Sequence, residues 1–316
     1  MDLKSWGEFG LIEHIQAGIQ VPEGITGIGD DCAIIPQQTG RETLVSTDML
    51  VEGSHFLMDH ITPYQLGWKS AAVNISDLAA MGGRCVGSFL SFALPKGLQQ
   101  AWIEDFFRGY KELSALYDCP LLGGDTTTSP DRLCINVTVL GEMPSGTSVK
   151  RNGAKVGDWI CVTGTLGDSA AGLQHILQQK PLDEAGQWLV DRHYLPRPRI
   201  REGMALAAAG VHAMMDISDG IGSDLRHILK ASGVGAEVDL RSIPVSEVMQ
   251  KKCADFGWDP LELALSGGED YELLFTLSPE QAEQLTVPHH RIGRIVAGNA
   301  LTWVGGAKDY VGFRHF

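Results

Sequence analysis

The chain is predicted to have an α/β or α+β architecture with two domains, and three observations support this prediction. Strand-like and helix-like segments alternate along the whole sequence. Its 316 residues suit one or two domains. A cluster of turn-forming residues, 144–148 (PSGTS), interrupts the pattern near the middle. We therefore expect an N-terminal α/β domain over residues 1–145 and a C-terminal α/β domain over residues 146–316.

The first half is predicted to contain three strands and two helices. Residues 43–46 are typical of a strand that delivers Thr47-Asp48 at its end. Thr62-Pro63 predicts a helix start, because threonine caps a helix and proline suits its first position. Gly82-Gly83 predicts the end of that helix near Met81. The other expected elements are a strand over 88–94, an amphipathic helix over 98–117 and a strand over 133–140.

The second half is predicted to be richer in helices. Its pattern of apolar residues and turn signals predicts strands over 159–162, 214–217 and 272–277, and helices over about 168–179, 184–193, 199–209 and 221–232.

Composition excludes several classes of function. Asp and Glu number 39 against 25 Lys and Arg, which gives a net charge of -14 and argues against a nucleic-acid partner. The N-terminus lacks the apolar core of a signal peptide, and no run of residues is long and apolar enough for a membrane span. None of the six cysteines forms a C-x-x-C pair. We therefore expect a cytoplasmic protein without a membrane partner.

Aspartates recur beside glycine, serine or threonine, with no basic residue next to them. They occur in the segments 27–31 (GIGDD), 46–48 (STD), 74–77 (NISD), 123–127 (GGDTT) and 216–220 (DISDG). Taken singly, each is explained as a turn or helix-cap residue, because its side chain bonds nearby backbone N–H groups. Taken together, five such segments indicate ligands of Mg²⁺, which prefers carboxylate and phosphate oxygens. Converging carboxylates would otherwise repel one another. The first interpretation is an enzyme that handles a metal-bound polyphosphate.

Other motifs restrict the kinds of nucleotide site that fit this sequence. The glycines of 123–127 and 266–270 (SGGED) let backbone N–H groups approach phosphates, although a simple turn explains them equally well. The sequence has no P-loop motif, and 26–29 (TGIG) lacks the third glycine of the dinucleotide fingerprint. Arg151 is a candidate phosphate ligand. His55 is a candidate for binding a phosphate on the acceptor, and a structural role is its alternative.

Together these segments resemble the thiamine-monophosphate kinase family, and the similarity runs essentially end to end. The resemblance lies in residues 29–33 (GDDCA), 51–56 (VEGSHF), 72–82 (AVNISDLAAMG), 123–127 (GGDTT), 162–172 (VTGTLGDSAAG), 217–220 (ISDG), 265–273 (LSGGEDYEL) and 312–316 (GFRHF). The short ISDG-type pieces also occur in the wider superfamily of aminoimidazole ribonucleotide synthetase. The longer motifs, in this order, are more specific to the thiamine-phosphate kinases.

The resemblance implies an aminoimidazole ribonucleotide synthetase-like fold. The N-terminal sheet would form a β-barrel across a homodimer interface, and the C-terminal domain would complete the active-site cleft. ATP would lie between the domains with several Mg²⁺ ions, and a K⁺ requirement is left open. The implied reaction converts ATP and thiamine monophosphate into ADP and thiamine diphosphate by direct in-line transfer. No catalytic acid or base is expected, because the substrate phosphate is already largely dianionic at neutral pH.

The resemblance also assigns site residues by motif. The implied magnesium ligands are Asp31, Ser46, Thr47, Asp48, Asp77, Asp125, Asp216 and Asp219, with Asp30 in support. Nucleotide contacts would come from Gly124, Asp125, Arg151 and Ser218. Thiamine monophosphate would contact His55, Glu269 and Phe313. An aromatic residue within 106–110 (FFRGY) is a further candidate for packing on the nucleotide.

Two alternatives stay open on sequence grounds. Another ATP-dependent member of the superfamily would act on a different phosphate or amide. Within that group a selenophosphate synthetase is disfavoured, because the first cysteine, Cys32, directly follows the aspartate pair. Aminoimidazole ribonucleotide synthetase is not expected to carry SGGEDYEL. The second alternative is a non-catalytic module whose acidic loops bind Ca²⁺ for structure.

Overall fold

A computed structural model of the chain describes residues 17–20, 22, 39–306 and 308–313. Contacts divide these residues into two compact units. The N-terminal unit takes the described residues up to Leu78 together with Arg84–Gly146. The C-terminal unit takes Ala79–Gly83 and the described residues from Thr147 onward. Each unit has its own β-sheet, so each is described by itself.

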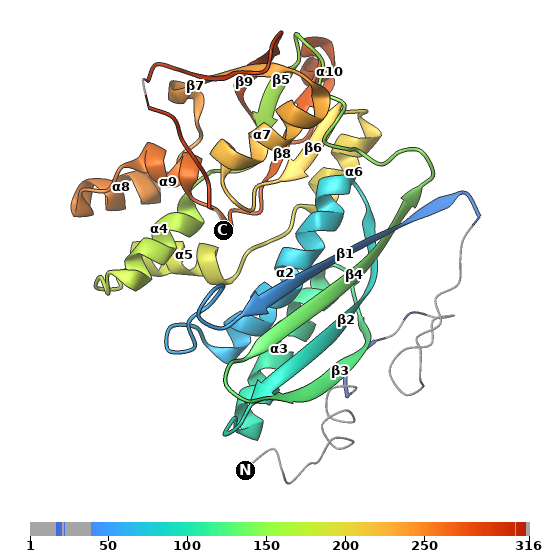
Figure 1. The fold of residues 1–316 in the computed structure, drawn as a ribbon, viewed down its shortest axis with the longest axis vertical. Helices are drawn as coiled ribbons and strands as arrows, with labels where there is room; N and C mark the ends of the chain where they lie inside the picture. Colours follow the sequence, from blue (N-terminus) through green and yellow to red (C-terminus); the bar gives the residue numbers. More distant parts are fainter. Residues whose placement is uncertain (1–16, 21, 23–38, 307, 314–316) are drawn as a thin grey trace. The chain divides into compact units, whose positions relative to one another are not determined.

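The N-terminal unit is a four-stranded sheet with two helices on one face (Figure 1). Its elements are β1 (Arg41–Val51), α2 (Pro63–Met81), β2 (Arg84–Pro95), α3 (Gln100–Leu116), β3 (Leu121–Ser129) and β4 (Cys134–Pro144). The strand order is β1-β4-β2-β3; β4 pairs antiparallel with β1 and β2, and β3 pairs parallel with β2. The described sheet is open, with β1 and β3 at its edges.

Glycines let the two helices of this unit approach closely. A Cβ on Gly67 of α2 would lie 1.9 Å from the Phe106 carbonyl oxygen, and one on Gly109 of α3 would lie 2.0 Å from the Tyr64 carbonyl oxygen. Larger residues at these positions would push the helices apart. Close packing of α2 and α3 therefore depends on two small residues.

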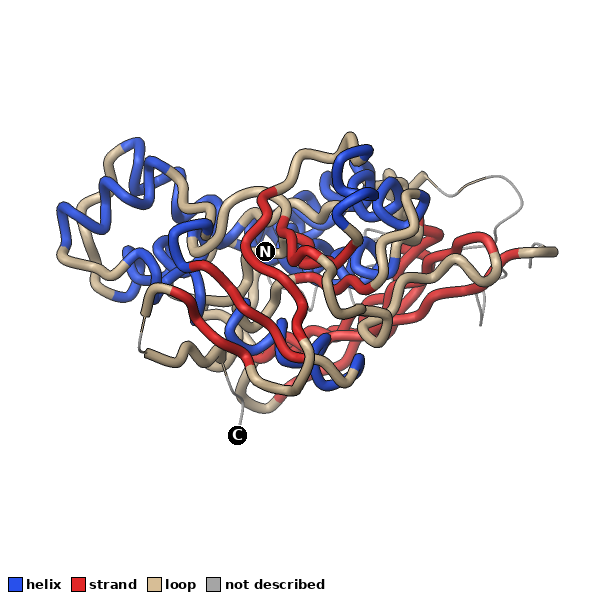
Figure 2. Tube along the Cα trace, turned by 90° about the horizontal axis from the view of Figure 1, so that it is seen from above, coloured by secondary structure: helices blue, strands red, loops and turns tan. Residues whose placement is uncertain are grey.

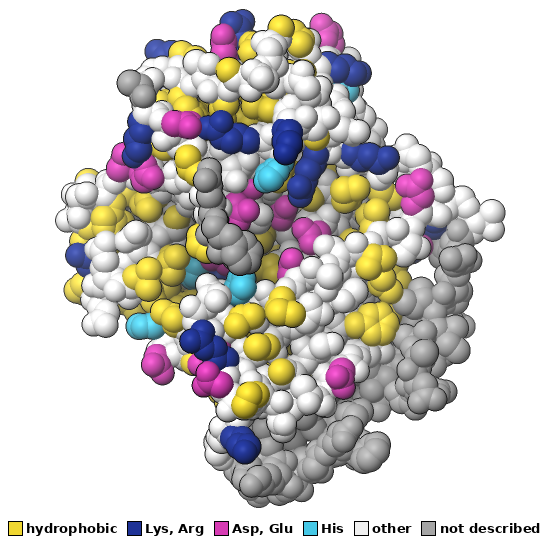
Figure 3. Space-filling model, in the orientation of Figure 1, with side chains coloured by type: hydrophobic (Ala, Val, Ile, Leu, Met, Phe, Trp, Pro, Cys, Tyr) yellow, Lys and Arg dark blue, Asp and Glu magenta, His cyan; other side chains and the backbone are white. Residues whose placement is uncertain are grey.

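The two faces of this sheet differ in burial. Leu50, Leu90 and Val137 are buried, as expected for the face covered by helices. On the other face Val45 is 64% exposed and Met49 is 58% exposed. Figure 3 shows hydrophobic side chains on this face over β1 and β4. Among the described residues, an apolar strip of β1, made of Val45 and Met49, thus stays uncovered.

The C-terminal unit is built on a six-stranded mixed sheet. Its elements are β5 (Trp159–Val162), α4 (Asp168–Leu177), α5 (Glu184–Tyr194), α6 (Ile200–Ala208), β6 (Ala213–Asp216), α7 (Ile221–Ser232), β7 (Gly235–Asp239), the 3₁₀ helix η2 (Leu240–Ser242), α8 (Glu247–Phe256), α9 (Pro260–Ser266), β8 (Leu273–Leu277), α10 (Pro279–Gln284), β9 (His290–Val296) and β10 (Leu301–Val304). The strand order is β10-β7-β9-β5-β8-β6, and only β10 and β7 pair in parallel.

The core of this unit lies between the sheet and its helices. Val162, Leu274 and Ile295 of the sheet belong to one buried cluster with Leu225 and Leu229 of α7. The helices α4, α5, α8 and α9 contact one another and lie together at the left of Figures 1 and 2. This helical group carries several of the site residues described below.

The structure confirms the predicted helices and corrects two predicted segments. Helices α2, α3, α4, α5, α6 and α7 lie where their sequence signals placed them. The predicted strand over 43–46 was too short, because β1 pairs with β4 over its full length, from Arg41 to Val51. Thr47-Asp48 therefore lies inside β1 rather than at its end. A simple turn is one of the two explanations that the sequence allows for the segment 123–127, and it is wrong, because the segment lies inside β3, paired with β2.

Within the described part of the chain, no helix combines the length and apolar character needed to cross a membrane.

Candidate active site

Strand β1 and helix α2 bring two of the predicted metal ligands together. The Ser46 hydroxyl donates a 2.5 Å hydrogen bond to Asp77 Oδ2. Asn74, one turn earlier on α2, accepts a 3.0 Å hydrogen bond from the Asp48 backbone N–H. Burial, and then the nearby charge of Asp77, raises the pKa of Asp48 to about 6. Asp48 and Asp77 are therefore like charges held close together, an arrangement that a bound cation relieves.

Thr47 and Asp125 lie elsewhere on the same sheet. Asp48 aligns across the strands with Val137, Leu90 and Gly124. Asp125 belongs to the next row, with Ser91, Asn136 and Met49. Adjacent positions of a strand point to opposite faces, so Asp125 and Thr47 face away from Asp48. The sheet of one chain therefore does not bring Thr47 and Asp125 to Asp48 and Asp77.

Thr47 is fixed by neighbours on β4. Its hydroxyl donates to the Val137 carbonyl oxygen at 3.1 Å and accepts hydrogen bonds from Asn136 Nδ2 and Thr138 Oγ1, each at 3.1 Å. Gly124 is constrained by the backbone of the neighbouring strand β2, because a Cβ on Gly124 would lie 1.9 Å from the Leu90 carbonyl oxygen. No larger residue fits Gly124 without moving β3 away from β2.

His55 lies in the turn that follows β1. The Val51 backbone N–H donates a 3.0 Å hydrogen bond to His55 Nδ1. A neutral His55 ring accepting at Nδ1 carries its proton on Nε2, which makes that atom a hydrogen-bond donor. Such a donor suits a phosphate oxygen, as the sequence predicted for His55.

The start of α7 gathers a second acidic group. Asp216 ends β6, and Ser218-Asp219-Gly220 forms the turn into the helix. Asp224 Oδ2 accepts hydrogen bonds from the backbone N–H groups of Asp219 and Gly220, at 3.2 and 3.1 Å. Burial, followed by the charges of Asp216 and Asp219, raises the pKa of Asp224 to about 8. Asp224 is not predicted from the sequence, where its only local signal is an acidic residue in the first turn of a helix.

The glycine-rich segment 266–270 lies beside this turn. The Glu269 N–H donates to the Ser218 carbonyl oxygen at 2.8 Å, and a Cβ on Gly268 would lie 2.3 Å from that oxygen. The Phe313 N–H donates to the Asp219 carbonyl oxygen at 2.9 Å, and the Phe313 side chain is 55% exposed. The C-terminal unit thus brings together Ser218, Asp219, Glu269 and Phe313, four residues that the sequence assigned to ligand binding.

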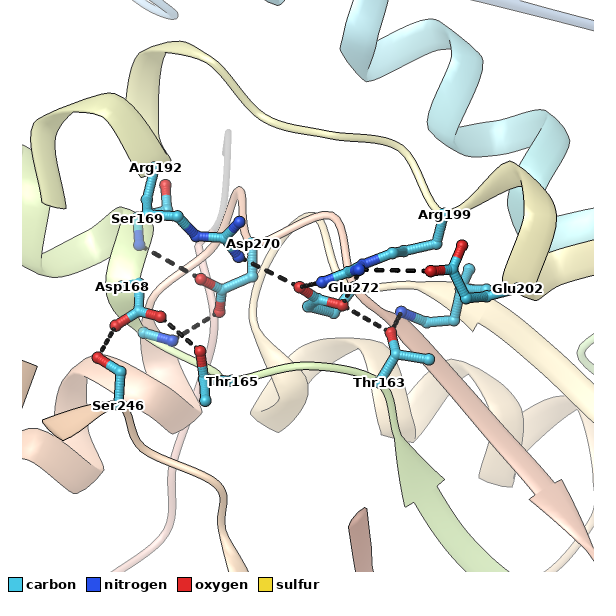
Figure 4. Close-up of polar contacts among 12 residues, drawn as sticks. Thr163, Thr165, Asp168, Ser169, Arg192, Arg199, Glu202, Ser246, Asp270 and Glu272 are labelled. Atoms are coloured by element: carbon cyan, nitrogen blue, oxygen red, sulfur yellow. Dashed lines mark hydrogen bonds and ion pairs between the residues drawn. The ribbon is translucent and has the colours of Figure 1, made fainter. Parts of the chain in front are cut away.

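Buried ion pairs hold Glu272, two residues after this segment (Figure 4). Glu272 is 1% exposed and accepts hydrogen bonds from Arg199 Nε at 2.7 Å and Arg199 Nη2 at 2.5 Å. Arg192 Nη2, at 3.2 Å, and Thr163 Oγ1, at 2.7 Å, complete its partners. A buried carboxylate needs such partners to remain charged. Sequence analysis missed this network, whose members come from separate elements.

The structure also describes Arg151 and the aromatic candidates for packing on the nucleotide. Arg151 is exposed, and its carbonyl oxygen accepts a 3.0 Å hydrogen bond from Ser232 Oγ, which fixes the backbone of its turn. Phe106, Phe107 and Tyr110 are buried in the N-terminal unit, with at most 1% exposure each. Arg108 is exposed and stacks 4.4 Å from the centre of the Tyr64 ring.

The predicted metal ligands offer only oxygen, which fits a hard cation such as Mg²⁺. Asp30 and Asp31 lie outside the described residues. Within the described ranges, no three His, Cys, Asp or Glu side chains converge closely enough to hold a metal ion. The two acidic groups, Asp48–Asp77 and Asp216–Asp219–Asp224, each belong to a single unit.

Family comparisons agree with this architecture. Residues 29–143 match the AIR synthase related protein N-terminal domain, and residues 155–304 match the AIR synthase related protein C-terminal domain. These matches cover most of the chain and define its class, the AIR synthase related proteins.

Similar proteins identify the family within that class. Thiamine-monophosphate kinase from Salmonella typhimurium is 44% identical over 98% of each chain. The crystal structure of thiamine-monophosphate kinase from Stenotrophomonas maltophilia is 37% identical, with a TM-score of 0.83 over 96% of this chain and 98% of that one. The structure of AaThiL complexed with AMPPCP and TMP is 36% identical, with a TM-score of 0.83 over 100% of this chain and 99% of that one. The chain belongs to the thiamine-monophosphate kinase family.

Proposed function

We propose that this protein transfers the γ-phosphoryl group of ATP to the phosphate of thiamine monophosphate, giving ADP and thiamine diphosphate for thiamine diphosphate biosynthesis. The observation that carries the proposal is its likeness to AaThiL, whose structure is described as a complex with AMPPCP and TMP. That likeness extends over 100% of this chain at 36% identity. The residues assigned to ligand binding in the C-terminal unit, Ser218, Asp219, Glu269 and Phe313, lie together as such a site requires.

Magnesium would be held by the acidic groups of both units. The proposed ligands are Asp31, Ser46, Thr47, Asp48, Asp77, Asp125, Asp216 and Asp219. Thr47 and Asp125 face away from Asp48 on the sheet of one chain, so they would hold a different ion from Asp48 and Asp77. Bound Mg²⁺ would neutralise charge on the phosphates of ATP and on the transferring group. The charge of Asp77 contributes to the raised pKa of Asp48. This is expected for two carboxylates whose mutual repulsion a bound cation would neutralise.

The transfer itself is proposed to be direct and in line. A monoester phosphate with a second pKa near ~6 is mostly dianionic at neutral pH, so it attacks without a general base. The protein then contributes position and charge. Gly124, Asp125, Arg151 and Ser218 would contact ATP, and His55, with its donor at Nε2, would contact the acceptor phosphate. Glu269 and Phe313 would contact the thiamine rings.

We propose a homodimer in the cytoplasm as the working form. The uncovered face of the N-terminal sheet supports this proposal, since Val45 and Met49 expose more than half of their surfaces on an open sheet. Pairing two such sheets across a dimer interface would produce the β-barrel that the family resemblance implies. It would also cover the apolar strip of β1.

A product assay tests the proposed function. Purified protein is incubated with ATP, Mg²⁺ and thiamine monophosphate, with unphosphorylated thiamine as a parallel substrate, and products are identified by mass spectrometry. Thiamine diphosphate from the monophosphate alone supports the proposal. If no product forms while Mg²⁺-dependent ATP binding persists, the substrate lies elsewhere in the superfamily. Ca²⁺ binding without nucleotide binding would instead support a structural module.

A further inference from the structure

A buried chain of polar groups in the C-terminal unit ends at Glu269. His193, near the end of α5, places its Nδ1 3.4 Å from Glu269 Oε2 and 3.0 Å from the hydroxyl oxygen of Ser169. Ser169 lies in the first turn of α4. His193 and Ser169 are buried, at 4% and 1% exposure, whereas the Glu269 side chain is 30% exposed. The series of polar groups Ser169–His193–Glu269 therefore runs from the helical core to a carboxylate that can reach a ligand.

The direction of these contacts depends on which ring nitrogen of His193 carries the proton. An ionised carboxylate only accepts hydrogen bonds, so a bond between His193 and Glu269 requires a proton on Nδ1. The Ser169 oxygen lies within reach of the same N–H group, which it can share with Glu269 as a second acceptor. With its proton on Nδ1, His193 is a donor aimed between Ser169 and Glu269, held in place by α4 and α5.

The backbone around Glu269 is also held in an unusual conformation. Glu269 has a φ of +64° and Tyr271 has a φ of +51°, values that favour glycine. Non-glycine residues persist there only where the surroundings over-determine them, and such residues cluster at ligand sites. The N–H groups of Glu269 and Tyr271 donate to the carbonyl oxygens of Ser218 and Ile217, at 2.8 and 2.9 Å. The position of Glu269 is thus fixed through its backbone and its side chain.

Asp270, the residue after Glu269, connects the same segment to α4. Asp270 accepts hydrogen bonds from the backbone N–H groups of Gly167, at 2.7 Å, and Ser169, at 3.4 Å, at the start of α4. Figure 4 shows Asp270 pointing toward this helix start. Consecutive acidic residues therefore contact different helices: Glu269 contacts α5 through His193, and Asp270 contacts α4.

We propose that His193, supported by Ser169, is a positioning residue that aims the Glu269 carboxylate at the organic part of the substrate and so sets substrate specificity. The proposal rests on the proposed function, in which Glu269 contacts thiamine monophosphate. A carboxylate accepts hydrogen bonds from an amino group and repels a carbonyl oxygen. Aiming Glu269 therefore favours an aminopyrimidine over an analogue that has a carbonyl group in place of the amino group.

Three variants and one control test this role. His193→Phe keeps the ring volume and removes the donor, His193→Asn keeps an N–H donor near the position of Nδ1, and Ser169→Ala removes the support. His175→Phe is the matched control, because His175 is also buried in the α4–α5 pair but hydrogen-bonds the Pro181 carbonyl oxygen. Thermal unfolding of each variant checks folding. Steady-state kinetics with thiamine monophosphate, oxythiamine monophosphate and ATP measures specificity.

His193→Phe is expected to raise KM for thiamine monophosphate about tenfold, since a hydrogen bond to a charged group is lost, while KM for ATP changes less than about twofold. The preference for thiamine monophosphate over oxythiamine monophosphate falls with it. His193→Asn restores most of the preference, Ser169→Ala shows a smaller loss, and His175→Phe keeps the preference.

Unchanged preference in folded His193→Phe would overturn the proposal, and so would equal losses in His193→Phe and His193→Asn, which would show that His193 only fills space. Should His193→Phe fail to fold, Ser169→Ala decides: wild-type preference in that variant overturns the role. A wild-type protein without activity on thiamine monophosphate overturns the proposed function itself, and this inference with it.

Discussion

Asp77 of α2 lies close enough to Asp48 of β1 to raise its pKa, although 28 residues separate them in sequence. Burial is the larger cause, and the pKa of Asp48 rises from 3.8 to about 6. Folding without a cation therefore disfavours the charged form of Asp48. The same two carboxylates are proposed magnesium ligands, so stability and function should respond in opposite directions when one of them is neutralised.

Asp48→Asn is expected to lower turnover at least about 100-fold, as for loss of a group that stabilises transferring charge. In protein treated with EDTA the same variant should unfold at a higher temperature than wild type at pH 8. Because the folded pKa of Asp48 lies above its unfolded value, metal-free wild type loses stability as the pH rises from about 3.8 to about 6. The variant lacks that loss, so the two melting temperatures should converge near pH 3.8.

Calorimetry of the EDTA-treated protein measures the effect on stability, and an ATP-dependent assay after Mg²⁺ is restored measures the effect on turnover. Near-wild-type turnover in Asp48→Asn would remove Asp48 from the metal site. A lower melting temperature than wild type at pH 8, without metal, would contradict the described carboxylate pair.

Asp224 is expected to act through its two backbone hydrogen bonds. Asp224→Asn keeps an acceptor oxygen for the N–H groups of Asp219 and Gly220, whereas Asp224→Ala leaves both groups without it. We expect Asp224→Ala to lose about tenfold or more in kcat/KM for ATP and Asp224→Asn to stay within about threefold. Kinetics at saturating thiamine monophosphate measures this difference. Equal losses in Asp224→Asn and Asp224→Ala would contradict this role and assign the effect to the lost charge instead.

His55→Ala should raise KM for thiamine monophosphate more than KM for ATP, because the proposed donor at Nε2 contacts the acceptor phosphate. A loss of about tenfold is expected for a hydrogen bond to a charged oxygen. His60→Ala is the matched control, since His60 is an exposed histidine a few residues further on. An equal or larger effect of His55→Ala on ATP would contradict the assigned role.

Gly124 should be sensitive to the smallest enlargement. In Gly124→Ala the new methyl group would meet the Leu90 carbonyl oxygen, which belongs to the paired strand β2. The free energy of unfolding is expected to fall by about 1–3 kcal/mol, the range for overpacking. Gly123→Ala is the comparison, because its Cβ would meet only the Phe89 ring, at 3.0 Å. Denaturant unfolding that ranks Gly123→Ala as the more damaging change would contradict the described register of β3.

The exposed face of β1 should control assembly. Met49→Asp puts a charge into the proposed dimer interface, so it should convert a dimer into a monomer, as measured by size-exclusion chromatography with light scattering. Leu177→Asp changes an exposed apolar residue of α4 and should leave the dimer intact. A dimer that survives Met49→Asp unchanged would place the interface on another surface.

Local signals account for the parts of the fold that the sequence predicted. Thr62-Pro63 and Gly82-Gly83 give α2 its start and end, because capping and backbone freedom act within a few residues. The same reasoning failed for β3, where glycines inside a strand resemble a turn until the pairing with β2 is known.

The same distinction between local sequence signals and contacts with distant elements applies to the candidate site. Asp48, Asp77, Asp216 and Glu269 are predicted as site residues because they lie in short glycine-, serine- and threonine-rich motifs. Asp224, His193 and Glu272 were missed, since their significance comes from partners on other elements. Motif resemblance also cannot show that strand alternation turns Asp125 away from Asp48 within one sheet.

The most direct test of the proposed reaction follows the γ-phosphoryl group itself. ATP labelled with ¹⁸O on the non-bridging oxygens of its γ-phosphate is incubated with the protein, Mg²⁺ and thiamine monophosphate, and the products are weighed by mass spectrometry. Direct transfer predicts that all of these labelled oxygens appear in the terminal phosphate of thiamine diphosphate, together with unlabelled ADP. Label found only in free phosphate, with thiamine monophosphate unchanged, would contradict the proposed kinase activity.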